Sequence, residues 1–207
     1  MSENPGTDPT ALPDPRWAFW AGSTGLVALA SYIALNAVSA SGPVAVLLTF
    51  GFGFGLTVAS IGLHLGVTGA VAPRLGLLAA VANAMAAAEL VAMLLVQLAV
   101  KAAVERPEGA VTAIWLGLDV AWDLFVGMGT VLFGLALWQH PRFRPLVALT
   151  GMAVGILLLL LNIATFPTPP AEAGLFDMGP IVGLWYLILC MRVLVVVRTS
   201  SSSPPSG

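Results

Sequence analysis

The chain has 207 residues, of which 58% are hydrophobic and 9% are charged, and its mean hydropathy is +0.97. Soluble domains carry about 25% charged residues, so this composition excludes a soluble globular protein and indicates an integral membrane protein. The net charge of −2, with eight Lys and Arg residues in all, excludes a nucleic-acid-binding face. A single cysteine excludes an internal disulfide, and two histidines are too few for a three-histidine metal site.

Six long apolar runs follow one another along the chain. Each is long enough to cross about 30 Å of hydrocarbon as a helix, and none alternates polar and apolar residues as the strands of a membrane barrel do. The predicted fold is therefore all-α, a polytopic bundle of transmembrane helices. The six spans are predicted at residues 17–40, 44–71, 76–101, 111–138, 146–166 and 181–198. Residues 1–16, with four prolines, and the Ser/Pro run 199–207 are predicted to be disordered tails.

The distribution of Lys and Arg predicts the orientation of these spans. Six spans place one group of basic residues on the side that also holds both termini, and only Lys101 and Arg106 on the other side. Both termini are therefore predicted to be cytoplasmic, in a cell (inner) membrane. An alternative is that Val38-Ser39-Ala40 ends a cleaved signal peptide, although the segment before Trp17 is acidic rather than basic. The basic group on the terminal side is Arg16, Arg74, Arg142, Arg144, Arg192 and Arg198.

Ionisable residues inside the predicted spans are the main candidates for function, because they are costly in hydrocarbon. They are Glu89, Asp119, Asp123 and His64. Asp119 and Asp123 are four residues apart and share one helix face. Glu89 and Asp123 each lie about 18 Å from the non-cytoplasmic end of their spans, so the two carboxyls can meet near the midplane. Protonated carboxyls that share a hydrogen bond would be structural, whereas a proton or cation pathway would be functional.

Small and polar residues line one face of the second span. Thr, Ser and Gly recur there at helical spacing up to His64 and Thr68, which is typical of a packing face whose hydroxyls bond to their own backbone. His64 itself is interpreted as a hydrogen-bonded interior histidine or as a proton-handling residue. Trp115 and Trp122 share the aspartate side of the fourth span and either pack in the core or line a pocket. Glycine pairs at spacing four favour tight packing or a homo-oligomer: Gly51, Gly55, Gly62, Gly66, Gly151 and Gly155.

The connection between the fifth and sixth spans has the most individual sequence, NIATFPTPPAEAGLFDMGPIVGLWY from Asn162 to Tyr186. Three prolines stiffen its start, and Asp177 precedes a proline suited to the first position of a helix. This stretch predicts either a structured, capped loop or a lid over a pocket on the outer face. In the second case Asn162, Phe166 and Asp177 would contact a ligand.

That connection and the fourth-span stretch WLGLDVAWDLFVGMGTVLFGLALW resemble uncharacterised bacterial six-helix membrane proteins, families defined only as domains of unknown function. The resemblance extends over most of the chain from Trp17. It implies the six-helix fold and no activity.

Three functions remain open from the sequence. The leading hypothesis is a small transporter or proton-coupled permease that uses the intramembrane carboxylates. The alternatives are a membrane-embedded enzyme acting on a lipid-like substrate and a structural or regulatory subunit of a membrane complex. No catalytic motif, metal-ligand set or cofactor motif is present, and the expected partners are the lipid bilayer and a second membrane protein. A cavity reaching both faces would favour transport, a cavity open to lipid would favour the enzyme, and the absence of a cavity would favour the subunit.

Overall fold

The structure is a computed structural model, and it describes residues 12–37, 42–103, 109–143 and 145–201. Within these residues the chain forms six helices long and apolar enough to cross a membrane, and no strand. The all-α fold with six spans is thereby confirmed. The helices are α1 (Pro15–Ala37), α2 (Gly42–Leu63), α3 (Pro73–Ala103), α4 (Gly109–Trp138), α5 (Leu146–Thr165) and α6 (Gly179–Ser201). A π-helical turn, η1 (His64–Thr68), continues α2.

The helix ends differ from the predicted ones by a few residues for local reasons. α1 begins at Pro15 because the Asp14 carboxylate accepts hydrogen bonds from the backbone N–H groups of Arg16 (2.9 Å) and Trp17 (3.3 Å), which caps the helix. Leu12, in the predicted tail, is buried in the core. α6 continues to Ser201, and the rest of both predicted tails lies outside the described residues.

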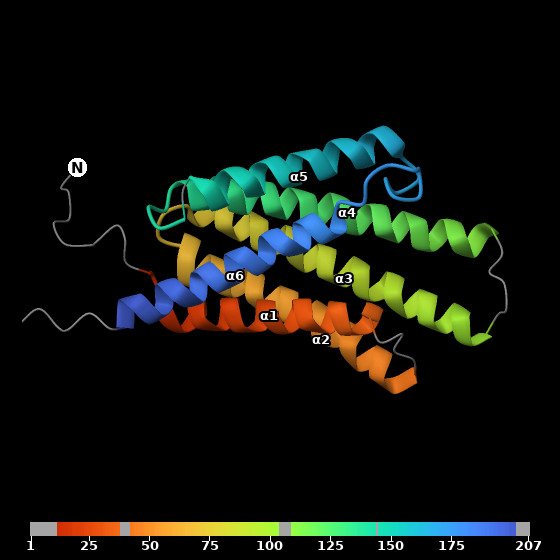
Figure 1. The fold of residues 1–207 in the computed structure, drawn as a ribbon, viewed down its shortest axis with the longest axis horizontal. Helices are drawn as coiled ribbons and strands as arrows, with labels where there is room; N and C mark the ends of the chain where they lie inside the picture. The colour runs from red at the N-terminus through yellow and green to blue at the C-terminus, as the bar shows by residue number, and fades with distance from the viewer. Residues whose placement is uncertain (1–11, 38–41, 104–108, 144, 202–207) are drawn as a thin grey trace, which may run out of the picture.

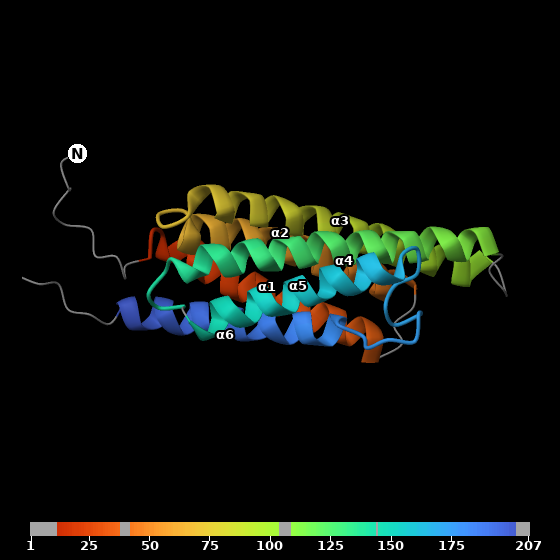
Figure 2. The same cartoon turned by 90° about the horizontal axis from the view of Figure 1, so that it is seen from above.

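The six helices form a ring in which each packs against its neighbours in sequence, and α1 packs against α6 to close it (Figures 1 and 2). Because the helices alternate in direction, the start of α1 and the end of α6 lie at one end of the bundle. We call this the terminal end. The opposite end, which carries the connection of residues 166–178 between α5 and α6, is called the loop end.

The glycines that the sequence offered as an oligomer interface are covered by helices of the same chain. A side chain at Gly62 or Gly66 of α2 would overlap the backbone of α1 near Trp17 and Ala18. Gly151 of α5 receives the ring of Trp185, and Gly155 faces the Gly127 carbonyl of α4. These small residues therefore let the helices of one bundle approach closely.

The ring is closed by equally tight contacts between its first and last helices. A side chain added at Gly22 would lie 2.5 Å from Cγ of Leu194, and one added at Gly25 would overlap the sulfur of Cys190. At the terminal end, the Arg142 guanidinium donates to the Ser200 hydroxyl (2.7 Å), and Arg192 donates to the Arg142 carbonyl (3.1 Å). These bonds fix the end of α6 against the α4–α5 connection.

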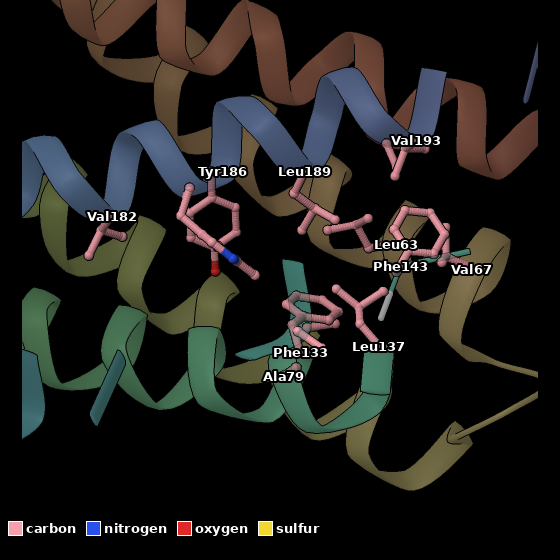
Figure 3. Close-up of a cluster of buried hydrophobic side chains, with 14 of the residues drawn as sticks. Leu63, Val67, Ala79, Phe133, Leu137, Phe143, Val182, Tyr186, Leu189 and Val193 are labelled. Atoms are coloured by element: carbon pink, nitrogen blue, oxygen red, sulfur yellow. The ribbon is translucent and has the colours of Figure 1, made fainter. Parts of the chain in front are cut away.

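A cluster of large apolar side chains fills the terminal half of the ring (Figure 3). Each of its members is at most 2% exposed, so this part of the interior is dry and tightly packed. We call this cluster the terminal-end plug. It consists of Leu63, Val67, Phe133, Leu137, Phe143, Leu189 and Val193.

Candidate functional site

A cavity lies inside the ring, in its loop half. Its volume is about 70 Å³, and side chains from α1, α2, α4, α5 and α6 line it. Its lining reaches the loop end at Gly179 and Tyr32, which are exposed, and stops at Leu63 of the terminal-end plug. The exposed part of its lining therefore lies in the loop half of the bundle, and its lining toward the terminal end is buried.

Asp123 is the carboxylate in the cavity wall. Its side chain is half-buried, and its Oδ2 accepts a hydrogen bond from the Asn162 side-chain amide of α5 at 2.9 Å. The same amide also donates to the Leu158 carbonyl at 3.1 Å, so Asn162 is held in place by its own helix. Because Asn162 occupies only one carboxylate oxygen, Asp123 keeps capacity to bind a further donor.

Three aromatic rings gather beside Asp123. The Tyr32 and Phe52 ring centroids are 5.4 Å apart, and Phe52 meets Trp122 edge to face at 5.7 Å. All three residues line the cavity and come from different helices, α1, α2 and α4. The wall is therefore largely apolar and aromatic around a single acidic group.

Ser60 of α2 places a hydroxyl in the same wall. The threonines of the polar face of α2 bond to their own backbone, as predicted: Thr49 donates to Ala45 and Thr57 to Gly53. Ser60 is fully buried, yet its Oγ has no hydrogen-bond partner within the described residues. A buried hydroxyl normally has a partner, so Ser60 Oγ has unused hydrogen-bonding capacity beside the cavity.

Tyr186 anchors the wall on the α6 side. The Asn83 amide of α3 donates to the Tyr186 oxygen at 2.7 Å, and that oxygen lies 3.3 Å from Oγ1 of Thr130 in α4. Thr130 in turn donates to the Val126 carbonyl at 2.6 Å, so the Tyr186 hydroxyl hydrogen points to Thr130. This bonded chain joins three helices directly behind the cavity.

The loop end of the cavity is acidic. Asp119 lies one turn nearer that end than Asp123. Asp177 and Glu172 lie close enough for their negative charges to repel that of Asp119. Asp177 also acts on Asp123 and Tyr32. We call Asp119, Glu172 and Asp177 the acidic mouth. No Lys or Arg is among the residues that line the cavity, and the described chain holds no group of three His, Cys, Asp or Glu arranged for a metal ion.

Glu89 and His64 lie away from this cavity. Glu89 is half-buried on α3, beside the exposed Met85 and Ala88, and α3 contributes no residue to the cavity wall. His64 begins the π-helical turn, and its Nδ1 faces Gly76 of α3 without a hydrogen-bond partner within the described residues. Asp123 and Asn162 are therefore the pair that the structure brings together, and the pairing of Glu89 with Asp123 stays a prediction.

The α5–α6 connection places its three candidate residues differently. Asn162 is buried beside Asp123, whereas Phe166 is 71% exposed and is not among the residues that line the cavity. Asp177 is exposed, and its carboxylate accepts a hydrogen bond from the Gly179 N–H at 2.8 Å, which caps α6 as the sequence suggested. It also contributes charge to the acidic mouth.

Sequence reasoning missed several residues of the wall. The chain has two tyrosines, Tyr32 and Tyr186, and both lie within spans and line the cavity. Tyrosines of membrane proteins concentrate at the interfaces, so their place inside spans was an available signal. No sequence signal marked Phe52, because phenylalanine is common in transmembrane helices. Trp122 lines the cavity, which is one of the two roles that the sequence suggested for it, the other being core packing.

Comparisons with models of protein families, with curated proteins and with solved structures find no match to this chain.

Proposed function

We propose that the protein is a small proton-coupled transporter whose substrate site is the cavity beside Asp123. The supporting observation is the position of Asp123: a carboxylate within a candidate membrane span, in the wall of a cavity whose exposed lining lies in the loop half of the bundle. A cavity reaching both faces was the feature expected to favour transport, and this cavity instead stops at the terminal-end plug, so the proposal takes the plug as a closed gate. The loop end would be the extracytoplasmic one, since the arginines gather at the other end.

A carboxylate suits the coupling role because it can exchange a proton for a donor group of the substrate. Asn162 holds Asp123 through one oxygen and leaves the other available. The terminal-end plug would have to part for release on the far side. Its members come from α2, η1, α4, α6 and the α4–α5 connection, so a tilt of these helices against one another would open it.

The two alternatives have less support. An enzyme would need a second acid, base or nucleophile at bonding distance from Asp123, whereas the described partner of Asp123 is an amide. A purely structural subunit was expected to lack a cavity and to expose a glycine-rich face, but the cavity is present and the glycines face helices of the same chain. The likeness to uncharacterised six-helix proteins stays a prediction and implies no activity.

Access to Cys190 from the two sides of the membrane tests the proposal. Cys190 is the single cysteine of the chain and lines the cavity. Proteoliposomes of known protein orientation are treated on one side with Ag⁺, a thiol-reactive cation small enough for the cavity of about 70 Å³. The fraction of blocked Cys190 is measured by mass spectrometry after unfolding and alkylation of the thiols that stayed free. A carrier predicts modification from the loop end and, more slowly, from the terminal end. A pH gradient should change the ratio of the two rates, and Asp123→Asn should remove that change.

Two controls accompany this measurement. Cys190→Ala should take up no reagent, and Ile188→Cys in that background places a thiol on the lipid-exposed face of the same helix, where an impermeant reagent should not reach it. Modification of Cys190 from the loop end alone, at every pH gradient, would contradict a carrier and leave a one-sided binding pocket.

A further inference from the structure

We infer that the ligand of the cavity is a small organic ammonium cation, a methylated or alkylated amine in its protonated form. This inference rests on the proposed function in taking the cavity as the substrate site, and it names the substrate class. Four features support this inference: the aromatic rings of the wall, its charge, the unpartnered hydroxyl of Ser60 and the volume of the cavity.

The aromatic rings supply a surface for a cation. Tyr32, Phe52 and Trp122 meet at centroid distances of 5.4 and 5.7 Å and all line the cavity. The negative faces of aromatic rings attract ammonium groups. These three rings contact one another, so a cation would lie against the cavity side of the cluster and not between the rings. An uncharged ligand would gain only apolar contact from the same rings.

The charge of the site has a single sign. Asp123 lies in the wall, the acidic mouth lies nearer the loop end, and no basic residue lines the cavity. A low-dielectric passage with acidic walls concentrates cations and repels anions. No cluster of three potential ligands for a metal ion is present within the described residues, so an organic cation fits this charge better than a divalent metal.

The volume limits the size of the ligand. The cavity of about 70 Å³ is roughly half of an engineered cavity of about 150 Å³ that holds benzene. A group of about three to five heavy atoms therefore fits, and larger dyes or drug-like cations do not. A longer tail would have to extend through the opening toward Gly179.

Ser60 provides the remaining polar contact. Ser60 is among the residues that line the cavity, and its hydroxyl oxygen is buried without a partner within the described residues, so a ligand would reach it after a small movement of the wall. A protonated amine donates N–H bonds, and both the Asp123 carboxylate and the Ser60 oxygen accept them. Ser60 and Asp123 come from α2 and α4, so one small ammonium group between them would bridge two sides of the ring.

Ligand-observed saturation-transfer NMR on the full chain in lipid nanodiscs tests this inference. The probe is trimethylammonium, with tert-butanol as the neutral compound of similar shape and acetate as the anion. We expect trimethylammonium to bind about tenfold more tightly than tert-butanol or better, and acetate not to bind. Asp123→Asn should abolish the preference for the cation.

Matched variants separate the site from general effects on folding. Phe52→Leu removes a ring of the wall and should weaken trimethylammonium binding roughly fivefold, whereas Phe50→Leu removes an exposed ring from the same helix and should change nothing. Glu89→Gln removes an intramembrane carboxylate outside the cavity and is the control for Asp123→Asn. If Asp123→Asn fails to fold, the comparison of Phe52→Leu with Phe50→Leu still tests whether the ligand is an ammonium cation.

The outcomes distinguish the ligand class from the transport proposal. Equal affinity for trimethylammonium and tert-butanol, or equal effects of Phe52→Leu and Phe50→Leu, would overturn the ammonium site. Selective trimethylammonium binding with Cys190 reachable only from the loop end would keep the ligand class and reject the carrier. Two-sided access without selective binding would keep the carrier and reject the ligand class.

Discussion

Single polar residues decide what the interior of this bundle can do. Asp123 has a fixed partner in Asn162 and a free side toward the cavity, while Ser60 has no protein partner at all. Thr49 and Thr57, on the same helix as Ser60, satisfy their hydroxyls on their own backbone. Hydroxyls on one helix therefore differ in whether they bond to the backbone, and Ser60 is the one on α2 that is left with unused hydrogen-bonding capacity.

Tyr186→Phe should destabilise the bundle. The substitution keeps the ring but leaves the buried Asn83 amide without its acceptor at 2.7 Å. The cost is expected to be about 1 kcal/mol, since buried hydrogen bonds in membrane proteins contribute about that much. Thermal unfolding in detergent measures it. Tyr32→Phe is the control, since Tyr32 is partly exposed, and an unchanged melting temperature for Tyr186→Phe would show that the bonded chain adds no stability.

His140 makes the stability depend on pH. Burial, and then the positive charge of Arg142, lower the pKa of His140 below its usual value of 6.5. Its Nδ1 accepts a hydrogen bond from the Arg142 N–H (3.3 Å), which the neutral ring permits and the protonated ring does not. The unfolded chain takes up a proton near pH 6.5, so it binds more protons than the folded chain just below that pH.

The contribution of His140 is therefore fully present above about pH 6.5 and is lost as the pH falls below it. The melting temperature in detergent should decrease between pH 7 and pH 5, and His140→Gln should decrease less over the same range. Subtracting the two curves removes the titration of the carboxylates. Parallel curves would mean that His140 does not contribute to the pH dependence.

Helices in this bundle approach one another through glycine. Gly66→Ala should separate α1 from α2, because the new methyl group would overlap the backbone of Ala18, which cannot move aside as a side chain can. A loss of about 3 kcal/mol is expected. Gly117 of α4 has nothing within 4 Å of its added methyl position, so Gly117→Ala should be neutral or slightly stabilising. Chemical unfolding of both variants in mixed micelles compares them directly, and equal stabilities would refute the close contact.

The sequence predicted the spans well and the site only in part. A long apolar run with few charges can satisfy its backbone hydrogen bonds in a membrane as a helix, so the sequence was enough to predict the six helices. The position of Asp123 inside a span was also evident from the sequence. Equal depth alone suggested Glu89 as its partner, and that pairing stays a prediction. The rotation of α3 about its axis depends on packing, as where Gly129 of α4 makes room for Asn83, and depth does not report it. Such contacts join residues that are far apart in the sequence, so no local sequence pattern predicts them.

At the scale of the whole molecule, charge should set the orientation. The described arginines lie at the terminal end, and Lys101 lies near the opposite end of α3. We expect both termini to be cytoplasmic. A fluorescent-protein fusion at the C-terminus should fluoresce, and an alkaline phosphatase fusion at the same place should be inactive. Phosphatase fused after residue 107 should be active. An active phosphatase at the C-terminus would reverse the predicted orientation and place the cavity on the cytoplasmic side.

The contact between α1 and α6 also bears on biosynthesis. α1 is made first, yet the helix whose Leu194 and Cys190 fit against its glycines is made last. Until about residue 190 has entered the membrane, the ring stays open along one side, and Asp123 has no wall between it and lipid on that side. The nascent protein therefore carries an unshielded carboxylate from the insertion of α4 until that of α6, and the arrival of α6 shelters it. A chain that stops before Gly179 would present cellular quality control with an open bundle.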